Sequence, residues 1–255
     1  MKKTGEFKRT VDYACFVVFL LLSGHFRVLR RKLFMFSLFK RNKSKGKIRF
    51  VALPEIGWEL DKSDKSVKQW MNPDQVMALS LHFFPSPPDI PTVHDIEMAR
   101  KFYRHQITEA GGGLIQVDLI QVQGYSAVKT VFKLPQENGA LTYLSSITIP
   151  FSDCSYVIKI QAPDLEATGK REAVVTNELL EKGVVTKDGS GILGWAQDPY
   201  LASHNKGTLM NQSEKELYDL DFPDHPLSLA RTFLTKIEEG LTFDPQLGSL
   251  GRFKQ

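Results

Sequence analysis

"SAVKTVFKLPQENGALTYLSSITIP", residues 126–150, decides the fold of this chain. Two runs rich in β-branched and aromatic residues flank the dipeptide Asn138-Gly139. This dipeptide is the strongest short hairpin signal, because both residues tolerate the positive φ that a tight turn requires. Residues 126–135 and 140–150 are therefore predicted to pair as antiparallel strands.

Further runs with a two-residue alternation lie on both sides of this hairpin. In residues 75–84 the side chains of Met77, Leu79, Leu81 and Phe83 fall on one face, and those of Ala78, Ser80 and His82 fall on the other. Such alternation is typical of a half-buried antiparallel strand. The other predicted strands are residues 49–54, 57–60, 66–71, 114–124 and 155–162. Together they predict an antiparallel sheet of seven or eight strands.

Three segments have helical spacing, which makes the fold class α+β, with helices flanking the sheet. Thr92 and Asp95 form a start that resembles a capping box, and the segment that follows ends at the glycines from 111 onward. A second helix is predicted for 170–183, after Thr168-Gly169, and residues 184–216 are expected to be irregular. The third segment, 224–240, places one apolar stripe along its length: Leu227, Ala230, Leu234, Ile237 and Leu241.

The order of these elements resembles that of the Mog1/PsbP-like group of domains. The resemblance rests on LPEIGWEL, DIEMARKFYRHQI, GYSAVKTVFK and ITIPFSDCSYVIKIQA, and it covers about residues 48–162. It implies an antiparallel sheet flanked by helices and a non-enzymatic role as a protein-binding, adaptor or chaperone-like module. Residues 1–47 are expected to form a basic and apolar extension that is disordered or membrane-associated. Residues 48–255 are expected to form a single α+β domain with a C-terminal helical extension from about 163.

The charge is divided unevenly between the two ends of the chain. Residues 1–50 contain 14 Lys and Arg but only 2 acidic residues, whereas residues 51–255 contain 19 basic and 27 acidic residues. Neutralising nucleic-acid phosphates needs clustered Lys and Arg on the domain itself. The acidic domain is therefore not expected to bind nucleic acid, and its charge is compatible with a basic protein partner.

The apolar run at residues 13–24 leaves the cellular location open to several interpretations. It is shorter than the ~20 residues that a spanning helix needs, and basic, bulky residues follow it where a cleavage site needs small ones. His25 stands where a lipoprotein signal would place its cysteine. We expect a cytoplasmic protein, with membrane contact through residues 1–47 or a true start at Met35 as open alternatives. A membrane-surface structural protein acting through this basic tail is a further alternative.

Few residues are candidates for catalysis. Asp224-His225 pairs a carboxylate with an imidazole, as a general base requires, although capping of the last helix explains the pair better. Cys154 is a potential nucleophile with Asp153 beside it, yet it lacks a neighbouring cation, and a small buried thiol is expected. The alternative function is a hydrolase or lyase that uses Cys154 or His225.

The remaining polar candidates are assigned to structure. His94, Arg104 and His105 are expected on a solvated helix face, because His94 and His105 lack the i, i+4 spacing of helical metal ligands. Arg171 and Glu172 are expected to cap the second helix and form ion pairs, with ligand contact as the alternative. The sequence predicts no cofactor and no metal site.

Overall fold

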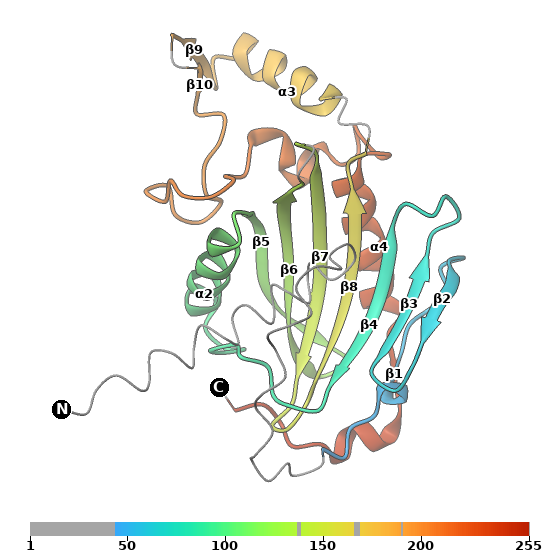
Figure 1. The fold of residues 1–255 in the computed structure, drawn as a ribbon. Helices are drawn as coiled ribbons and strands as arrows, with labels where there is room; N and C mark the ends of the chain where they lie inside the picture. Colours follow the sequence, from blue (N-terminus) through green and yellow to red (C-terminus); the bar gives the residue numbers. More distant parts are fainter. Residues whose placement is uncertain (1–43, 137–138, 166–168, 190, 255) are drawn as a thin grey trace, which may run out of the picture.

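The structure, a computed structural model, is built around a seven-stranded antiparallel sheet (Figure 1). The structure describes residues 44–136, 139–165, 169–189 and 191–254. The hypotheses about the apolar run and Met35, and the assignments for Asn138 and Thr168, concern residues outside this part of the chain. The strand order β2-β3-β4-β8-β7-β6-β5 confirms the predicted α+β class and the lower of the two strand counts. The strands are β2 (Glu59–Ser63), β3 (Val67–Met71), β4 (Ala78–Phe84), β5 (Gly113–Val122), β6 (Tyr125–Pro135), β7 (Leu141–Pro150) and β8 (Ser155–Pro163).

The hairpin predicted for residues 126–150 is present as β6 and β7. These strands pair in unbroken register from Val128 opposite Thr148 to Pro135 opposite Leu141. Gly139 in the turn has a φ of 83°, a conformation that glycine adopts without steric cost. The pairing predicted from the two apolar runs is therefore confirmed.

Helix α4 (Pro226–Gly240) covers one face of the sheet, behind β7 and β8 in Figure 1. The predicted stripe is confirmed, since all five of its side chains are fully buried. They pack on alternate residues of the central strands, among them Leu79 and Leu81 of β4 and Ile158 and Ile160 of β8. Burial of each such side chain contributes about 1.5–3 kcal/mol, so this layer supplies the main core.

Helix α2 (Ile96–Glu109) packs on the opposite face, beside β5. Ala99, Tyr103 and Ile107 are buried against residues of β5 and β6. The helix begins three residues later than expected. Asp95 is the N-cap, and its carboxylate accepts from the Met98 amide, while the Thr92 hydroxyl accepts from two amides in the preceding turn.

Helix α3 (Lys170–Glu181) lies beyond one end of the sheet (Figure 1). Val175, Leu179 and Tyr218 belong to a small separate apolar cluster there. The expectation of an irregular stretch at 184–216 was wrong in part. β9 (Thr186–Asp188) and β10 (Gly191–Leu193) form a hairpin, and two 3-10 turns follow at Gln212–Glu214 and Glu216–Tyr218.

The prediction of a first strand at residues 49–54 was also wrong in part, because the strand found there is shorter and lies outside the main sheet. The chain forms a 3-10 turn at Ile48–Phe50 and a two-residue strand β1 (Val51–Ala52), which pairs with β11 (Thr242–Phe243) outside the main sheet. Phe50 and Val51 are both buried although they are adjacent, which strand alternation does not allow. Instead these apolar side chains anchor the chain where α4 ends.

The two edges of the sheet are protected in different ways. β2 is exposed at all five positions, carries Glu59, Asp61 and Lys62, and contains a bulge in its pairing with β3. Along β5, the Tyr200 hydroxyl accepts from the Val117 amide at 2.9 Å, and the Thr208 amide donates to the Gly112 carbonyl at 3.0 Å. Charged side chains and a bulge therefore disfavour the pairing of a further strand with β2, and a chain segment covers part of the β5 edge.

Candidate functional site

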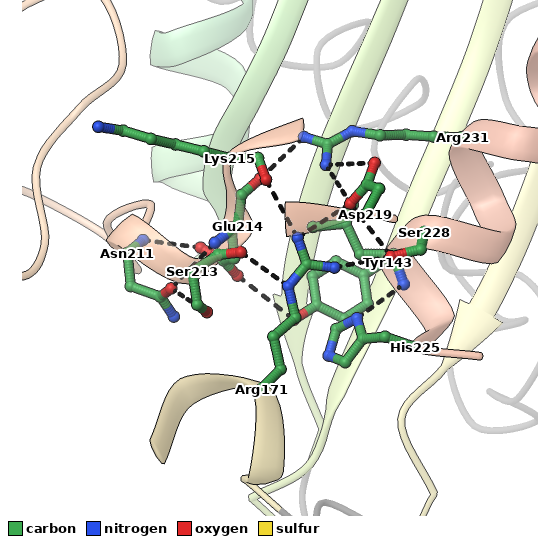
Figure 2. A network of polar contacts seen from close by, with 11 residues as sticks. Tyr143, Arg171, Asn211, Ser213, Glu214, Lys215, Asp219, His225, Ser228 and Arg231 are labelled. Atoms are coloured by element: carbon green, nitrogen blue, oxygen red, sulfur yellow. Dashed lines mark hydrogen bonds and ion pairs between the residues drawn. The ribbon is translucent and has the colours of Figure 1, made fainter. Parts of the chain in front are cut away.

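A buried polar network surrounds Arg171, whose side chain is 1% exposed (Figure 2). Its Nε donates to the Ser213 carbonyl at 2.7 Å and its Nη1 donates to the Ser228 hydroxyl at 2.7 Å. Nη2 donates to the Lys215 carbonyl at 3.1 Å and to the Asp219 carboxylate at 2.9 Å. One side chain from α3 therefore binds both the 211–219 segment and α4.

Glu214 is the second centre of this network and is completely buried. Its carboxylate accepts from Lys133 Nζ at 2.7 Å, from the Asn211 amide at 2.7 Å and from the Tyr143 hydroxyl at 3.3 Å. The Asn211 side chain in turn accepts from the Glu214 amide, which completes a capping box. The buried charge is thus paired and hydrogen-bonded, as burial requires.

Asp219 joins Arg171 to Arg231 of α4, whose Nη1 lies 3.1 Å from both carboxylate oxygens. Arg231 also donates to the Glu214 carbonyl at 2.9 Å. Among the described residues, the charged side chains that these contacts join are three cations and two carboxylates: Lys133, Arg171, Arg231, Glu214 and Asp219. We call this set, with Tyr143, Ser213 and Ser228, the Arg171 network.

The Arg171 network fixes a segment whose outer side is exposed and apolar. Leu217, within the 3-10 turn Glu216–Tyr218, is 65% exposed, and Leu220, which follows this turn, is 91% exposed. Glu216, Asp221 and Asp224 are exposed in the same segment. We call residues 215–224 the acidic ridge. Because the backbone beneath it is held by buried charge-assisted hydrogen bonds, its exposed side chains are presented with little loss of entropy on binding.

A cleft of about 360 Å³ adjoins this segment at Lys215 and Glu216, and residues of β5 and α4 also line it. Arg100, Lys215 and Arg231 supply cations to its wall, and Asp118 and Glu216 supply carboxylates. The rest of the wall consists of amide and apolar side chains: Ile115, Gln116, Gln197, Pro199, Tyr200, Met210, Asn211 and Gln212.

His225 is the N-cap of α4, as the sequence favoured, and Pro226 occupies the first helical turn. Its Nδ1 accepts from the Leu227 amide at 3.2 Å, so this nitrogen is occupied by the cap. Burial, with a smaller effect from the Arg171 charge, lowers the pKa of His225 to about 4. Asp224 is exposed beside it, and the structure shows no hydrogen bond between the two side chains. The pair therefore lacks the geometry of an oriented general base.

Cys154 lies in the turn between β7 and β8, completely buried and without a disulfide. Burial raises the pKa of its thiol to about 12, which disfavours the nucleophilic thiolate. Its backbone carbonyl accepts from the Phe151 amide, and its sulfur packs near Gly46 and Phe83. Cys154 and His225 also belong to different elements, with no contact between them.

His94 and His105, which were expected on a solvated helix face, are exposed. The assignment was wrong for Arg104, which is buried and pairs with Asp198 through Nε at 2.8 Å and Nη2 at 3.0 Å. Arg171 forms the expected ion pair, but the N-cap of α3 is Gly169.

In the described part of the chain, no group of three or more His, Cys, Asp or Glu is arranged to hold a metal ion. Likewise, no helix within the described ranges has the length and apolarity to span a membrane.

Sequence reasoning missed most of the charged members of the Arg171 network, including Glu214, Asp219 and Arg231. One signal was available, because the Asn-x-x-Glu pattern of Asn211 and Glu214 is a capping-box pattern. No such signal marked Leu217 and Leu220 as exposed, because leucines next to acidic residues occur both in half-buried helices and in loops.

Comparison with known proteins gives a weak structural likeness and nothing from sequence. No protein-family model matches the chain, and no curated protein matches it. Part of the chain is similar to the Ran-binding protein Mog1p of Saccharomyces cerevisiae, at 14% identity and a TM-score of 0.35, over 51% of this chain and 78% of that one. A protein of unknown function from Pseudomonas aeruginosa is similar at 15% identity and a TM-score of 0.32, over 47% and 83%. A Bacteroides thetaiotaomicron protein is similar at 8% identity and a TM-score of 0.31, over 47% and 41%. The Mog1/PsbP-like resemblance suggested by the sequence therefore recurs as a distant likeness.

Proposed function

We propose that this protein is a non-enzymatic binding module that holds a basic protein partner on its acidic ridge. The observation that carries the proposal is the exposure of Leu217 and Leu220 on a segment that the Arg171 network holds rigid. Exposed apolar side chains that gather on a fixed surface are typical of interaction sites.

The charge of the ridge supports a basic partner. Glu216, Asp221 and Asp224 are exposed in the same segment as the two leucines, and residues 51–255 carry a net charge of −8 at neutral pH. Complementary potential steers association and discriminates against acidic partners. A partner segment with alternating Lys or Arg and apolar side chains fits this surface, because it meets both the carboxylates and the leucines.

The surroundings of Cys154 and His225, the two candidate catalytic residues, also favour binding over hydrolysis. The Cys154 thiol is buried with a raised pKa, and His225 holds a helix cap. Neither residue lines the 360 Å³ cleft. A purified chain that turned over ester, phosphoester or peptide substrates, and lost this activity as Cys154→Ala or His225→Ala, would overturn the proposal.

The binding test uses a synthetic amphipathic peptide of lysine and leucine, with a peptide of glutamate and leucine in the same pattern as its control. We expect the full chain to bind the basic peptide and not the acidic one, measured by fluorescence anisotropy. A double variant, Leu217→Ser with Leu220→Ser, should weaken binding about tenfold or more, since it removes two apolar anchors. The matched control is Leu193→Ser, at a leucine of β10 that is 53% exposed. Equal weakening by the control variant contradicts the ridge as the docking surface.

A further inference from the structure

The cleft beside β5 has the size and wall chemistry of a small-molecule site. Its volume of about 360 Å³ lies within the usual range for ligand pockets, which is about 300–1,000 Å³. Its wall shares Lys215 and Glu216 with the acidic ridge but includes neither Leu217 nor Leu220, so the inference below does not depend on the leucines that carry the proposed function.

Two arginines in the cleft wall have unfilled hydrogen-bonding capacity. Arg231 is only 8% exposed, and its Nε has no hydrogen-bond partner among the described residues. The buried Nε of Arg100 is also without one in the described ranges. The Arg100 guanidinium stacks on the Tyr200 ring at 3.8 Å and pairs with Glu97, and these two contacts hold it in the cleft wall. A buried donor left unpaired is destabilising, so a ligand that accepts from it recovers the lost hydrogen-bond energy.

The cleft wall carries three cations and two carboxylates, and one of the cations, Arg100, also pairs with Glu97 through Nη1 at 2.8 Å. The described charges of the Arg171 network are three cations and two carboxylates, and Arg231 belongs to both the network and the cleft wall. Burial is the main cause of the lowered pKa of His225; the Arg171 and Arg231 charges lower it further, and the Asp219 charge opposes them. Lys215 is the third cation of the wall.

We propose that this cleft binds a small organic oxyanion, a carboxylate or a phosphate ester, through Arg100, Lys215 and Arg231. Guanidinium groups present paired donors that match either oxyanion. The amides of Gln116 and Asn211 can bond to further polar groups of the ligand. The opposing carboxylates of Asp118 and Glu216 repel additional negative charge and so select against long polyanions.

The test is a titration of the full chain at constant ionic strength with three probes: succinate, glycerol phosphate and chloride. Binding is followed by NMR, through the side-chain amide signals of Gln116 and Asn211. We expect saturable shifts with succinate or glycerol phosphate and none with chloride. The probe that binds more tightly identifies the oxyanion. Equal responses to all three probes, or no saturable response, overturn the proposal.

Charge-removing variants locate the site. Lys215→Gln and Arg100→Gln should each weaken binding about tenfold, because each removes one charge-assisted contact. Lys187→Gln on β9 is the matched control, since it removes an exposed cation outside the cleft wall and should leave the affinity unchanged. An equal effect of the control and the Lys215 variant shows non-specific attraction and overturns the proposal.

Discussion

The Nζ of Lys133 lies 2.7 Å from Oε2 of Glu214, although 81 positions separate the two residues in the sequence. Their side chains are 3% and 0% exposed. This ion pair ties β6, in the sheet, to the segment from which the acidic ridge continues. The ridge and the sheet are therefore connected by a charge pair that water does not reach.

Replacing Glu214 with glutamine should destabilise the protein by about 3–5 kcal/mol, because Lys133 is left buried without its counter-charge. Denaturation by urea measures the loss. The matched control is Glu178→Gln, which breaks the exposed Lys182–Glu178 pair and should leave stability nearly unchanged, because solvent screens this pair. The double variant Lys133→Met with Glu214→Leu should recover much of the loss. A small effect of Glu214→Gln alone contradicts the structural role given to this pair.

Stability should decrease as the pH falls from about 6.5 to about 4. Burial lowers the pKa of both His225 and His82 to about 4, so both are neutral when folded over this range but protonate when unfolded. The unfolded state then binds more protons, and the free energy of unfolding rises with pH across the window. Urea denaturation at several pH values measures this slope.

The variants His225→Asn and His82→Gln separate the two contributions. Asparagine is a good N-cap that does not titrate, so His225→Asn should keep the cap of α4 and flatten the slope. His94→Asn, at an exposed histidine of the described chain, is the control and should leave the slope unchanged. An unaltered slope in both buried-site variants shows that other groups control the acid sensitivity.

Cys154 should resist alkylation in the folded protein. With a pKa of about 12, its thiolate population at pH 8 is roughly a thousandfold below that of an ordinary cysteine. The experiment uses a Cys15→Ser variant, which leaves Cys154 as the one reactive thiol, and follows iodoacetamide labelling by mass spectrometry. Labelling should become fast in urea. Rapid labelling of the native protein contradicts both the burial and the raised pKa.

Gly113→Ala should displace the segment that covers the edge of β5. A Cβ at this position meets the backbone carbonyl of Thr208 at a separation that no real Cβ shows. We expect a loss of about 1–3 kcal/mol, with faster tryptic cleavage at Lys206. Gly189→Ala is the control, because an added Cβ there meets open space. Unchanged protease resistance in Gly113→Ala contradicts the close approach.

The sheet was predictable from the sequence because its determinants are local. Residues 126–150 combine period-two alternation with a turn dipeptide, and the stripe on α4 follows from spacing alone. The structure of residues 49–54 was harder to predict because it is not determined locally. Val51 and Ala52 pair with Phe243 and Thr242, which lie far along the chain. A short apolar run does not reveal whether it joins the sheet or closes against a distant segment.

The candidate site was less accessible to sequence reasoning. Arg104 and Asp198 look like ordinary surface residues until the fold brings them together, and the same holds for Lys133 and Glu214. Long-range ion pairs leave no periodic trace, because neither partner constrains the residues next to it in the sequence. The capping pattern at Asn211 was the exception, since its partner lies within one turn.

The contrasting treatment of β2 and β5 bears on how the protein behaves at high concentration. An antiparallel sheet with two bare edges is a template for chain-to-chain polymerisation. Here Glu59 and Asp61 discourage a second β2 from aligning beside the first, because like charges then face each other across the new ladder. Tyr200 already occupies a backbone donor that an incoming strand needs on β5. The fold therefore carries its own protection against fibril growth, and this protection is weakest wherever the covering segment detaches.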